Sequence, residues 1–317
     1  MKNPIIIFIL IILLSTTLVA CSGKKEQEEN KTEGKKIIEK SDGDKPKYTT
    51  QNQVHEALME KNSSYPWTGE FRFQGEDLVY AKLSQAELTD ISPLQNTPMV
   101  GIVLSGNINL VDITPLEGMR LQSLDLLMTK VRDISVLQGM PLIELYLDET
   151  KVSDLSPLRG MNLTKLYLNN TRISSIEALR DMPLGELNLL GTEIKDLSPL
   201  EGSPLQMLWL NETPVSDISP LQNLPLVSLT LMRTNVSDLS PLSRCLTLER
   251  LHIGETPVSD LSPLRNLTLT RLVFNPSNIK NGISQIKNMK TLTEIGPTLE
   301  NMVSPDVFWQ QYDNENL

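Results

Sequence analysis

The chain has 317 residues, of which 39% are hydrophobic and 4% aromatic, and its formal net charge is −10. This length and apolar content can bury a sizeable core, which excludes disorder throughout the chain. Because so few residues are aromatic, the core is expected to be aliphatic. The negative charge argues against nucleic acid as a partner, because phosphate binding needs clustered lysine and arginine.

Residues 1–20 have the features of a secretory signal peptide. The apolar run PIIIFILIILLSTT follows a single lysine and is shorter than the ~20 residues that a membrane-spanning helix needs. It leads into LVAC, which resembles the lipobox of bacterial lipoproteins. This resemblance implies cleavage before Cys21, acylation with fatty chains such as palmitate, and attachment to a membrane of the cell envelope. Because Ser22 rather than aspartate follows Cys21, the outer membrane is expected if the source is Gram-negative.

Residues 21–50 are expected to form a lipid-bearing, disordered tether. From residue 22 onward the segment is polar, with eight lysines against seven acidic residues. Such a composition cannot bury enough apolar surface to order itself. Residues 48–317 hold 20 basic and 32 acidic residues, so the part expected to fold has a net charge of −12.

Residues 51–77 are expected to cap the N-terminal end of the folded part. The sequence NQVHEALMEKN predicts a short helix. The sequence TGEFRFQGEDLVYAKLS predicts strands that cover the open core edge of the first repeat.

Residues 78–296 carry a tandem repeat. A phrase of the type Asp-Ile/Leu-Ser-Pro-Leu recurs every 21 or 22 residues. Its first position is occupied in turn by Asp90, Asp112, Asp133, Asp154, Ser175, Asp196, Asp217, Asp238 and Asp260. Before each phrase, leucines at the first, fourth and sixth places of segments such as LTKLYLNNT predict a short strand with one face inward. One such unit cannot cover its own apolar surface, so the units must stack.

The pattern resembles the leucine-rich repeats of internalin-like bacterial surface proteins, which run L-x-x-L-x-L-x-x-N-x-I-x-D-I-S-P-L. About nine or ten copies fit within residues 78–296. The resemblance implies an α/β solenoid, a curved right-handed coil with a parallel β-sheet of about nine strands on its concave side. It also implies short 3₁₀ turns on the convex side, a cap at each end, and binding through the concave face.

Two polar columns accompany the leucines. The aspartate of each phrase, or the serine after it, is expected to cap free N–H groups of a turn, and proline fits the first turn because it lacks an N–H group. Where the family more often has asparagine, this chain has Thr129, Thr150, Thr171, Thr192, Thr213, Thr234 and Thr256. Their hydroxyls are expected to bond between neighbouring coils, in a weaker ladder than asparagine would form.

The aspartate column raises the alternative of calcium binding. Stacked coils would place one carboxylate every ~4.8 Å, and calcium accepts carboxylate oxygens. However, Ser175 interrupts the column, and each aspartate has a sufficient capping role. We therefore expect no metal and no cofactor.

Candidate ligand-binding residues lie between the strand leucines, where alternate side chains point out from the concave sheet. The middle column holds Asp125 and an interrupted aromatic stripe, and the flanking columns hold charged and amide residues that include Glu186, Asp148 and Asn169. From these columns we select Tyr146, Tyr167, Trp209, His252, Glu144, Lys165 and Arg250 as candidate binding residues. Exposed aromatics beside hydrogen-bonding groups suit contact with a protein or a glycan. The alternative is that these rings only pack on their neighbours.

Residues 297–317 are expected to form the C-terminal cap. Ser304 and Pro305 are a helix-start signal. The aromatic side chains that follow, Phe308, Trp309 and Tyr312, are expected to cover the last coil rather than to bind a ligand.

Nothing in the sequence supports catalysis. His55 and His252 lie far apart without nucleophile or metal-ligand motifs, and no glycine-rich phosphate loop occurs. Cys245 stands where other repeats have methionine or leucine, so it is expected in the core, and it has no disulfide partner once Cys21 is acylated.

The prediction is a monomeric, non-enzymatic, lipid-anchored cell-envelope protein that binds an unidentified protein or glycan through its concave face. Two alternatives remain open. The first is a structural envelope scaffold without a specific ligand, and the second is a subunit that recruits a catalytic partner.

Overall fold

The computed structural model describes residues 48–315, so the predicted signal peptide, Cys21 and almost all of the predicted tether lie outside the described residues. Twelve strands form one sheet in chain order, from β1 to β12. Strand β1 (Glu70–Gln74) pairs antiparallel with β2 (Asp77–Lys82), and every later pair is parallel. The later strands are β3 (Gly101–Val103), β4 (Ser123–Asp125), β5 (Glu144–Tyr146), β6 (Lys165–Tyr167), β7 (Glu186–Asn188), β8 (Met207–Trp209), β9 (Ser228–Thr230), β10 (Arg250–His252), β11 (Arg271–Val273) and β12 (Glu294–Gly296).

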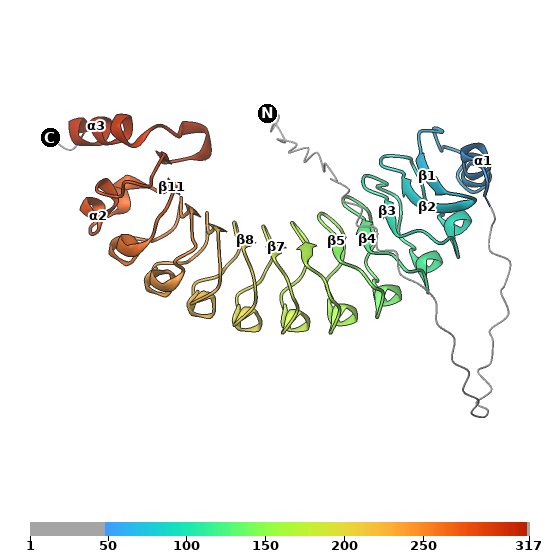
Figure 1. The fold of residues 1–317 in the computed structure, drawn as a ribbon, viewed down its shortest axis with the longest axis horizontal. Coiled ribbons are helices and arrows are strands. Elements are labelled where there is room, and N and C mark those ends of the chain that lie inside the picture. The colour runs from blue at the N-terminus through green and yellow to red at the C-terminus, as the bar shows by residue number, and fades with distance from the viewer. Residues whose placement is uncertain (1–47, 316–317) are drawn as a thin grey trace, which may run out of the picture. The chain divides into compact units, whose positions relative to one another are not determined.

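A short 3₁₀ turn lies opposite each repeat strand. The turns that begin within the nine repeated phrases are Ser92–Leu94, Thr114–Leu116, Ser135–Leu137, Ser156–Leu158, Glu177–Leu179, Ser198–Leu200, Ser219–Leu221, Ser240–Arg244 and Ser262–Asn266. Figure 1 shows the strands along the concave side of the array and the turns along its convex side. The predicted curved α/β solenoid with a parallel concave sheet is therefore confirmed.

The sheet is longer than the predicted nine strands. Strand β2 extends it before the first full repeat, and β12 extends it after the last. The first repeated phrase, at Asp90, follows β2, whereas no phrase follows β12. Strand β12 still finds a parallel backbone partner, because ladder hydrogen bonds depend on the main chain and not on the leucine pattern.

The same hydrogen bond opens all nine turns. The backbone N–H of the first turn residue donates to the side chain two residues earlier, which is an aspartate carboxylate in eight repeats and the Ser175 hydroxyl in one. The N···O distance is 2.8 Å at Asp154 and 3.3 Å at Ser175. Through this bond, the backbone N–H of Ser156 holds the pKa of Asp154 below its ordinary range. The predicted capping role of the column is confirmed.

The prediction that the threonine hydroxyls bond between coils is wrong. Each hydroxyl donates to the carbonyl oxygen three residues earlier in its own coil, as Thr171 does to Leu168 at 2.7 Å. The threonine hydroxyl is one bond from Cβ and does not reach the next coil, so it bonds within the turn that follows its own strand.

One asparagine in this column does join two coils. Asn107 is fully buried, and its amide nitrogen donates to the carbonyl oxygen of Leu83 in the preceding coil at 2.8 Å. Its amide oxygen accepts from the backbone N–H groups of Ala86 and Leu88 in that same coil. The amide therefore supplies the coil-to-coil bonds that the threonines lack.

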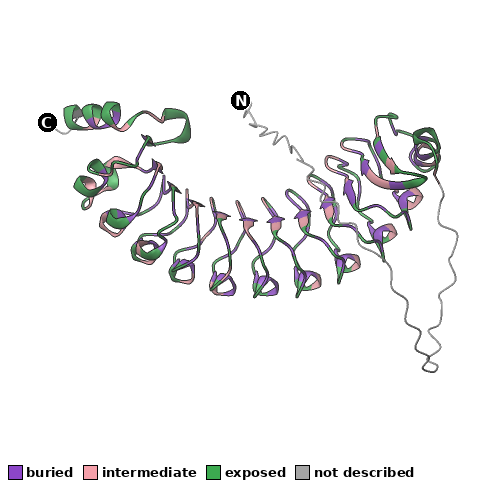
Figure 2. Cartoon of the chain, in the orientation of Figure 1, coloured by how far each residue is buried: buried purple, intermediate pink, exposed green. Residues whose placement is uncertain are grey.

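Leucine, isoleucine and valine side chains from successive coils form one continuous core. Figure 2 shows buried residues along the strands and the inner sides of the turns, with exposed residues between them. Cys245 is fully buried, as predicted, and its thiol donates to the carbonyl oxygen of Leu221 at 3.4 Å. Burial raises the pKa of this thiol, so it behaves as a core side chain and not as a reactive group.

Both ends of the core are covered. Helix α1 (Gln51–Lys61) begins with a capping box formed by Thr50 and Gln53 and buries Val54 and Leu58. At the other end lie α2 (Ile283–Lys287) and α3 (Pro305–Glu315). Within α3, Phe308 packs on Phe274 of the last repeat, with ring centroids 5.8 Å apart, as the covering role predicts. In residues 48–315, no helix combines the length and apolar character needed to span a membrane.

Candidate functional site

Three aromatic side chains form a connected row on the concave face. Tyr146 on β5 and Tyr167 on β6 have ring centroids 5.1 Å apart, with planes at 76°. Trp209 on β8 reaches across β7, which carries Asn188 at this position, and lies 5.9 Å from Tyr167 at 83°. All three side chains are half-buried. We call Tyr146, Tyr167 and Trp209 the aromatic row.

A row of alternating charges borders the aromatic row at the N-terminal ends of β5, β6 and β7. The Nζ atom of Lys165 lies 3.7 Å from Glu144 and 3.3 Å from Glu186. The Tyr167 hydroxyl donates to Glu186 at 2.7 Å, and the Tyr146 hydroxyl donates to Glu144 at 3.4 Å. These contacts fix the tyrosine rings against the charged row, so the surface is preorganised.

Burial and the nearby carboxylates raise the pKa values of both tyrosines. For Tyr146 the first cause is burial and the second is the charge of Glu144, while for Tyr167 burial is followed by the hydrogen bond to Glu186. The hydroxyls consequently stay protonated at neutral pH and act as donors to the glutamates.

Two further carboxylates border the aromatic row on its other sides. Asp125 is the register neighbour of Tyr146 on β4, and Asp148 lies two residues after Tyr146. Burial raises the pKa of Asp125 and raises that of Asp148 to about 7, although Asp148 accepts a hydrogen bond from the backbone N–H of Asn169 at 2.8 Å. Asp148 is only 7% exposed, so it lies beneath the concave face and acts on a ligand there through its charge rather than by direct contact.

The same region contains a side-chain acceptor without a donor. Asn169 stands next to Asp148 in the adjacent coil, and its Oδ1 atom is buried and accepts no hydrogen bond from residues 48–315.

The structure brings together five of the seven candidate residues, namely Tyr146, Tyr167, Trp209, Glu144 and Lys165. His252 and Arg250 lie on β10, two strands beyond Trp209. The expectation that His252 is open to a ligand is wrong, because the side chain is only 7% exposed and packs against Gly254. Burial also lowers the pKa of His252 and keeps the ring neutral. The selection missed Asp125, Asp148 and Glu186, although the high share of acidic residues in the concave columns was visible in the sequence.

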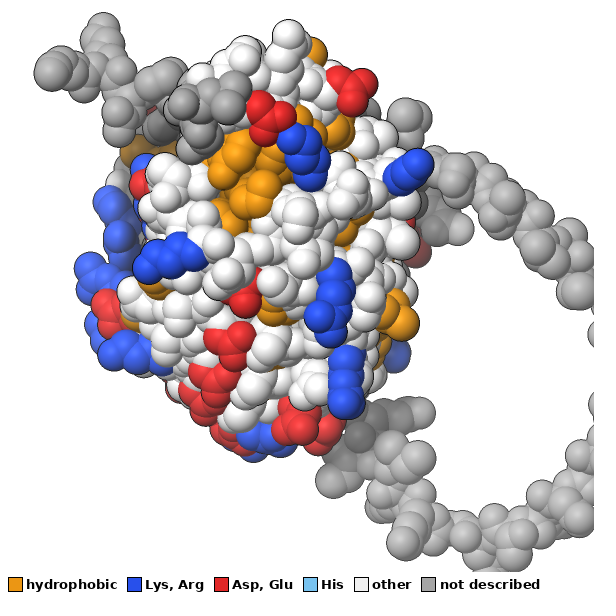
Figure 3. All heavy atoms as spheres, turned by 90° about the vertical axis from the view of Figure 1, so that its left-hand side faces the viewer, with side chains coloured by type: hydrophobic (Ala, Val, Ile, Leu, Met, Phe, Trp, Pro, Cys, Tyr) orange, Lys and Arg blue, Asp and Glu red, His pale blue; other side chains and the backbone are white. Residues whose placement is uncertain are grey.

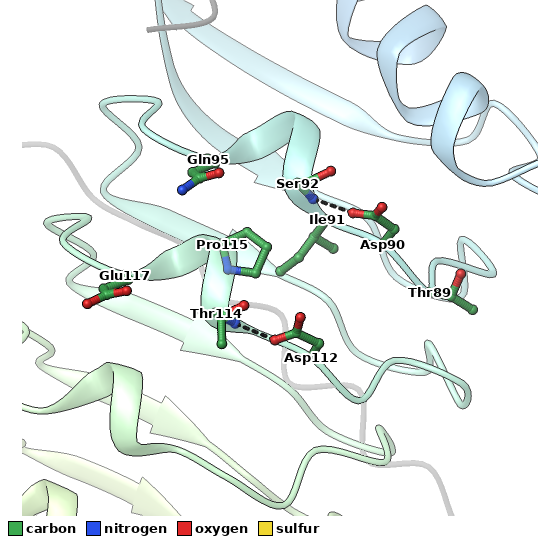
Figure 4. A pocket seen from close by; sticks show the side chains of 9 residues that line it. All are labelled: Thr89, Asp90, Ile91, Ser92, Gln95, Asp112, Thr114, Pro115 and Glu117. Atoms are coloured by element: carbon green, nitrogen blue, oxygen red, sulfur yellow. Dashed lines mark hydrogen bonds between the residues drawn. The ribbon is translucent and has the colours of Figure 1, made fainter. Parts of the chain in front are cut away.

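Two hollows lie away from the aromatic row. One, of about 530 Å³, lies between the first two convex turns and is lined by Asp90, Asp112 and Glu117 among others. Figure 4 shows that Asp90 and Asp112 each accept a hydrogen bond from the first residue of their own turn. The described part of the chain contains no group of three or more His, Cys, Asp or Glu side chains that could hold a metal ion.

The second hollow, of about 640 Å³, lies at the C-terminal end and is lined by Pro297, Met302, Phe308 and Tyr312 among others. Figure 3 faces this end and shows apolar side chains gathered there beside an acidic and a basic side chain. Since Phe308 and Tyr312 belong to the helix that covers the last coil, we assign this hollow to the cap.

Solved structures with a similar fold include internalin InlF from Listeria monocytogenes, which is 23% identical over 79% of this chain and 91% of its own, with a TM-score of 0.56. The leucine-rich-repeat ectodomain of the Arabidopsis thaliana receptor kinase GASSHO1/SCHENGEN3, in complex with Casparian strip integrity factor 2, is 20% identical over 68% of this chain and 29% of its own, also at 0.56. The functional domain of InlJ from Listeria monocytogenes is 18% identical over 68% and 57%, at 0.50. No family model and no curated protein sequence matches the chain. These similarities establish the leucine-rich-repeat fold.

Proposed function

We propose that this protein is a non-enzymatic, lipid-anchored binding protein of the cell envelope that holds a partner protein on its concave face. The observation that carries the proposal is the aromatic row, whose half-buried rings contact one another and are fixed by hydrogen bonds to glutamates. Rigid aromatic side chains bury large areas at little entropic cost, which makes them frequent anchors in protein interfaces.

A preformed sheet face favours binding over catalysis. The side chains of the aromatic row and of Glu144, Lys165 and Glu186 already have partners, so little conformational entropy is lost when a ligand binds. No nucleophile and base pair accompanies them among the described residues of the concave columns, where the one histidine is buried and neutral. A structural envelope scaffold is the alternative function.

Alanine substitution of Tyr167 or Trp209 is expected to weaken partner binding at least about tenfold, because each removes an anchor that contacts the rest of the row. The measurement is capture of envelope proteins by the full chain in detergent, followed by affinity determination for the captured partner. Ser228→Ala, on the concave face outside the row, is the matched control and should bind as the wild type does. A partner that is retained by both aromatic variants would favour the scaffold function.

Lipidation at Cys21 has its own test. In cells fed a labelled fatty acid, the wild-type chain should take up the label, and mass spectrometry should find acylated Cys21 as the first residue. Cys21→Ala should remove the label completely. Cys245→Ala is the control, because Cys245 is the other cysteine of the chain and lies in the core. Label that persists in Cys21→Ala would refute the lipid anchor.

A further inference from the structure

We propose that the aromatic row and the carboxylates around it bind a cationic side chain, an arginine or lysine, presented by an extended basic segment of the partner protein. This inference rests on the proposed function of the concave face and specifies the chemistry of the partner.

The charge of the site is negative. Glu144 and Glu186 border one side of the row, and Asp125 and Asp148 border the other sides. Lys165 is the single cation that contacts these groups in the described residues, and it is already placed between the two glutamates. A positive ligand therefore gains attraction from the site and from the acidic folded part as a whole, whereas an acidic ligand is repelled.

Aromatic faces attract cations within about 6 Å of the ring centroid. This chain makes such contacts elsewhere, with Arg72 at 5.0 Å from the centroid of Tyr80 and Lys287 at 6.0 Å from that of Trp309. In the aromatic row, both ring pairs are nearly perpendicular. The faces of neighbouring rings consequently point in different directions.

The hydrogen-bonding capacity of the site also favours a cation. Both tyrosine hydroxyls already donate to glutamates, and the partly exposed carboxylates of Glu144 and Glu186 accept hydrogen bonds. The site thus offers mainly acceptors. Guanidinium and ammonium groups carry donors and no acceptor, whereas the hydroxyls of a glycan need both.

The aromatic row together with Asp125 runs across the strands, from β4 to β8. With strands about 4.8 Å apart, four steps span roughly 19 Å, which is the length of about six residues of extended chain. A short extended segment with basic residues at alternate positions fits this span.

The site should respond to pH through Asp148. Its pKa of about 7 means that the carboxyl is largely neutral at pH 6 and largely anionic at pH 8. Among the described residues, the ionisable groups that interact with Asp148 are Asp125, Glu149 and Tyr167, none of which is a cation that would oppose a positive ligand. A bound cation favours the anion, and affinity should rise with pH as the proton is released.

The test uses the full chain in detergent and a blocked hexapeptide of alternating arginine and serine. A peptide with citrulline in place of arginine is the probe control, because citrulline has nearly the same shape without the charge. Calorimetry should show the arginine peptide binding at least about tenfold more tightly than the citrulline peptide, with an affinity that rises up to about tenfold from pH 6 to pH 8.

Variants locate the effect. Trp209→Ala should weaken binding of the arginine peptide at least about tenfold. Asp148→Asn removes a buried charge and keeps a side-chain oxygen that can accept from the backbone N–H of Asn169. This variant should abolish the pH dependence of the peptide affinity. Glu201→Gln removes the same charge from the exposed convex side and should change neither affinity nor pH dependence.

Several results would overturn the inference. They are equal binding of the two peptides, no binding of the arginine peptide, or binding insensitive to Trp209→Ala, which would indicate adsorption to the acidic surface elsewhere. If a captured envelope protein depends on the aromatic row but binds equally at pH 6 and pH 8 and to Asp148→Asn, the binding function stands and the cationic specificity fails.

Discussion

Replacement of Leu187 by alanine is expected to lower the free energy of unfolding by about 3 kcal/mol or more. Leu187 is the central residue of β7, is fully buried, and is the register neighbour of Leu166 and Leu208. Its removal leaves a cavity between coils that already pack on both sides, so the surrounding side chains can fill it only in part. Equilibrium denaturation followed by circular dichroism measures the change.

The position of Leu187 in the middle of the array adds a second expectation. Each coil contacts only its neighbours, so a destabilised central coil should allow the two halves of the array to unfold separately. The unfolding transition should then become broader. Leu246→Ala is the control, because this leucine is 65% exposed and its loss should change stability by less than about 0.5 kcal/mol. Equal effects of the two substitutions would contradict a continuous core.

The order of strands and turns could be predicted from the sequence because each repeat carries the same strand and turn signals. Leucines at alternate places give the buried face of the strand, and aspartate two residues before the turn gives its first hydrogen bond, as Asp154 and Ser156 illustrate. Since the coils stack in register, equivalent positions form columns. The residues of the concave face could therefore be named before the structure was known.

Contacts that depend on side-chain direction could not be read from the columns. The spacing placed Tyr167 and Trp209 two strands apart, and only the structure shows that their rings meet across Asn188. The burial of His252, whose ring lies beside Gly254, likewise shows only in the structure. Neither feature leaves a periodic signal, because each occurs once.

The carboxylates of the concave face illustrate the same limit for charge. Asp125 and Asp148 occupy ordinary column positions, and their raised pKa values result from burial that sequence spacing does not report. A buried carboxyl group with a raised pKa lowers the stability of the fold when it ionises. An aliphatic or amide residue in the same place would not have this cost. That cost is understandable if these groups serve binding.

Replacement of Asn107 by alanine is expected to destabilise the N-terminal coils by about 3 kcal/mol or more. The substitution removes the partner of the Leu83 carbonyl oxygen and of the N–H groups of Ala86 and Leu88. Asn107 is fully buried, so water does not take its place beside these main-chain groups. Each group left without a partner therefore costs its full desolvation free energy. Denaturant titration together with hydrogen exchange of the first two coils measures the effect.

Two further variants separate joining of the coils from simple loss of a hydrogen bond. Thr171→Ala removes one bond to Leu168 within a single coil and should cost about 1 kcal/mol. Asn107→Thr restores that local bond, here to Leu104, and should recover only about 1 kcal/mol of the loss caused by alanine. If Asn107→Ala and Thr171→Ala proved equally mild, the amide would not be joining the coils. A large difference would mean that in the N-terminal coils one amide adds a connection to the leucine packing and the strand ladder that all coils share.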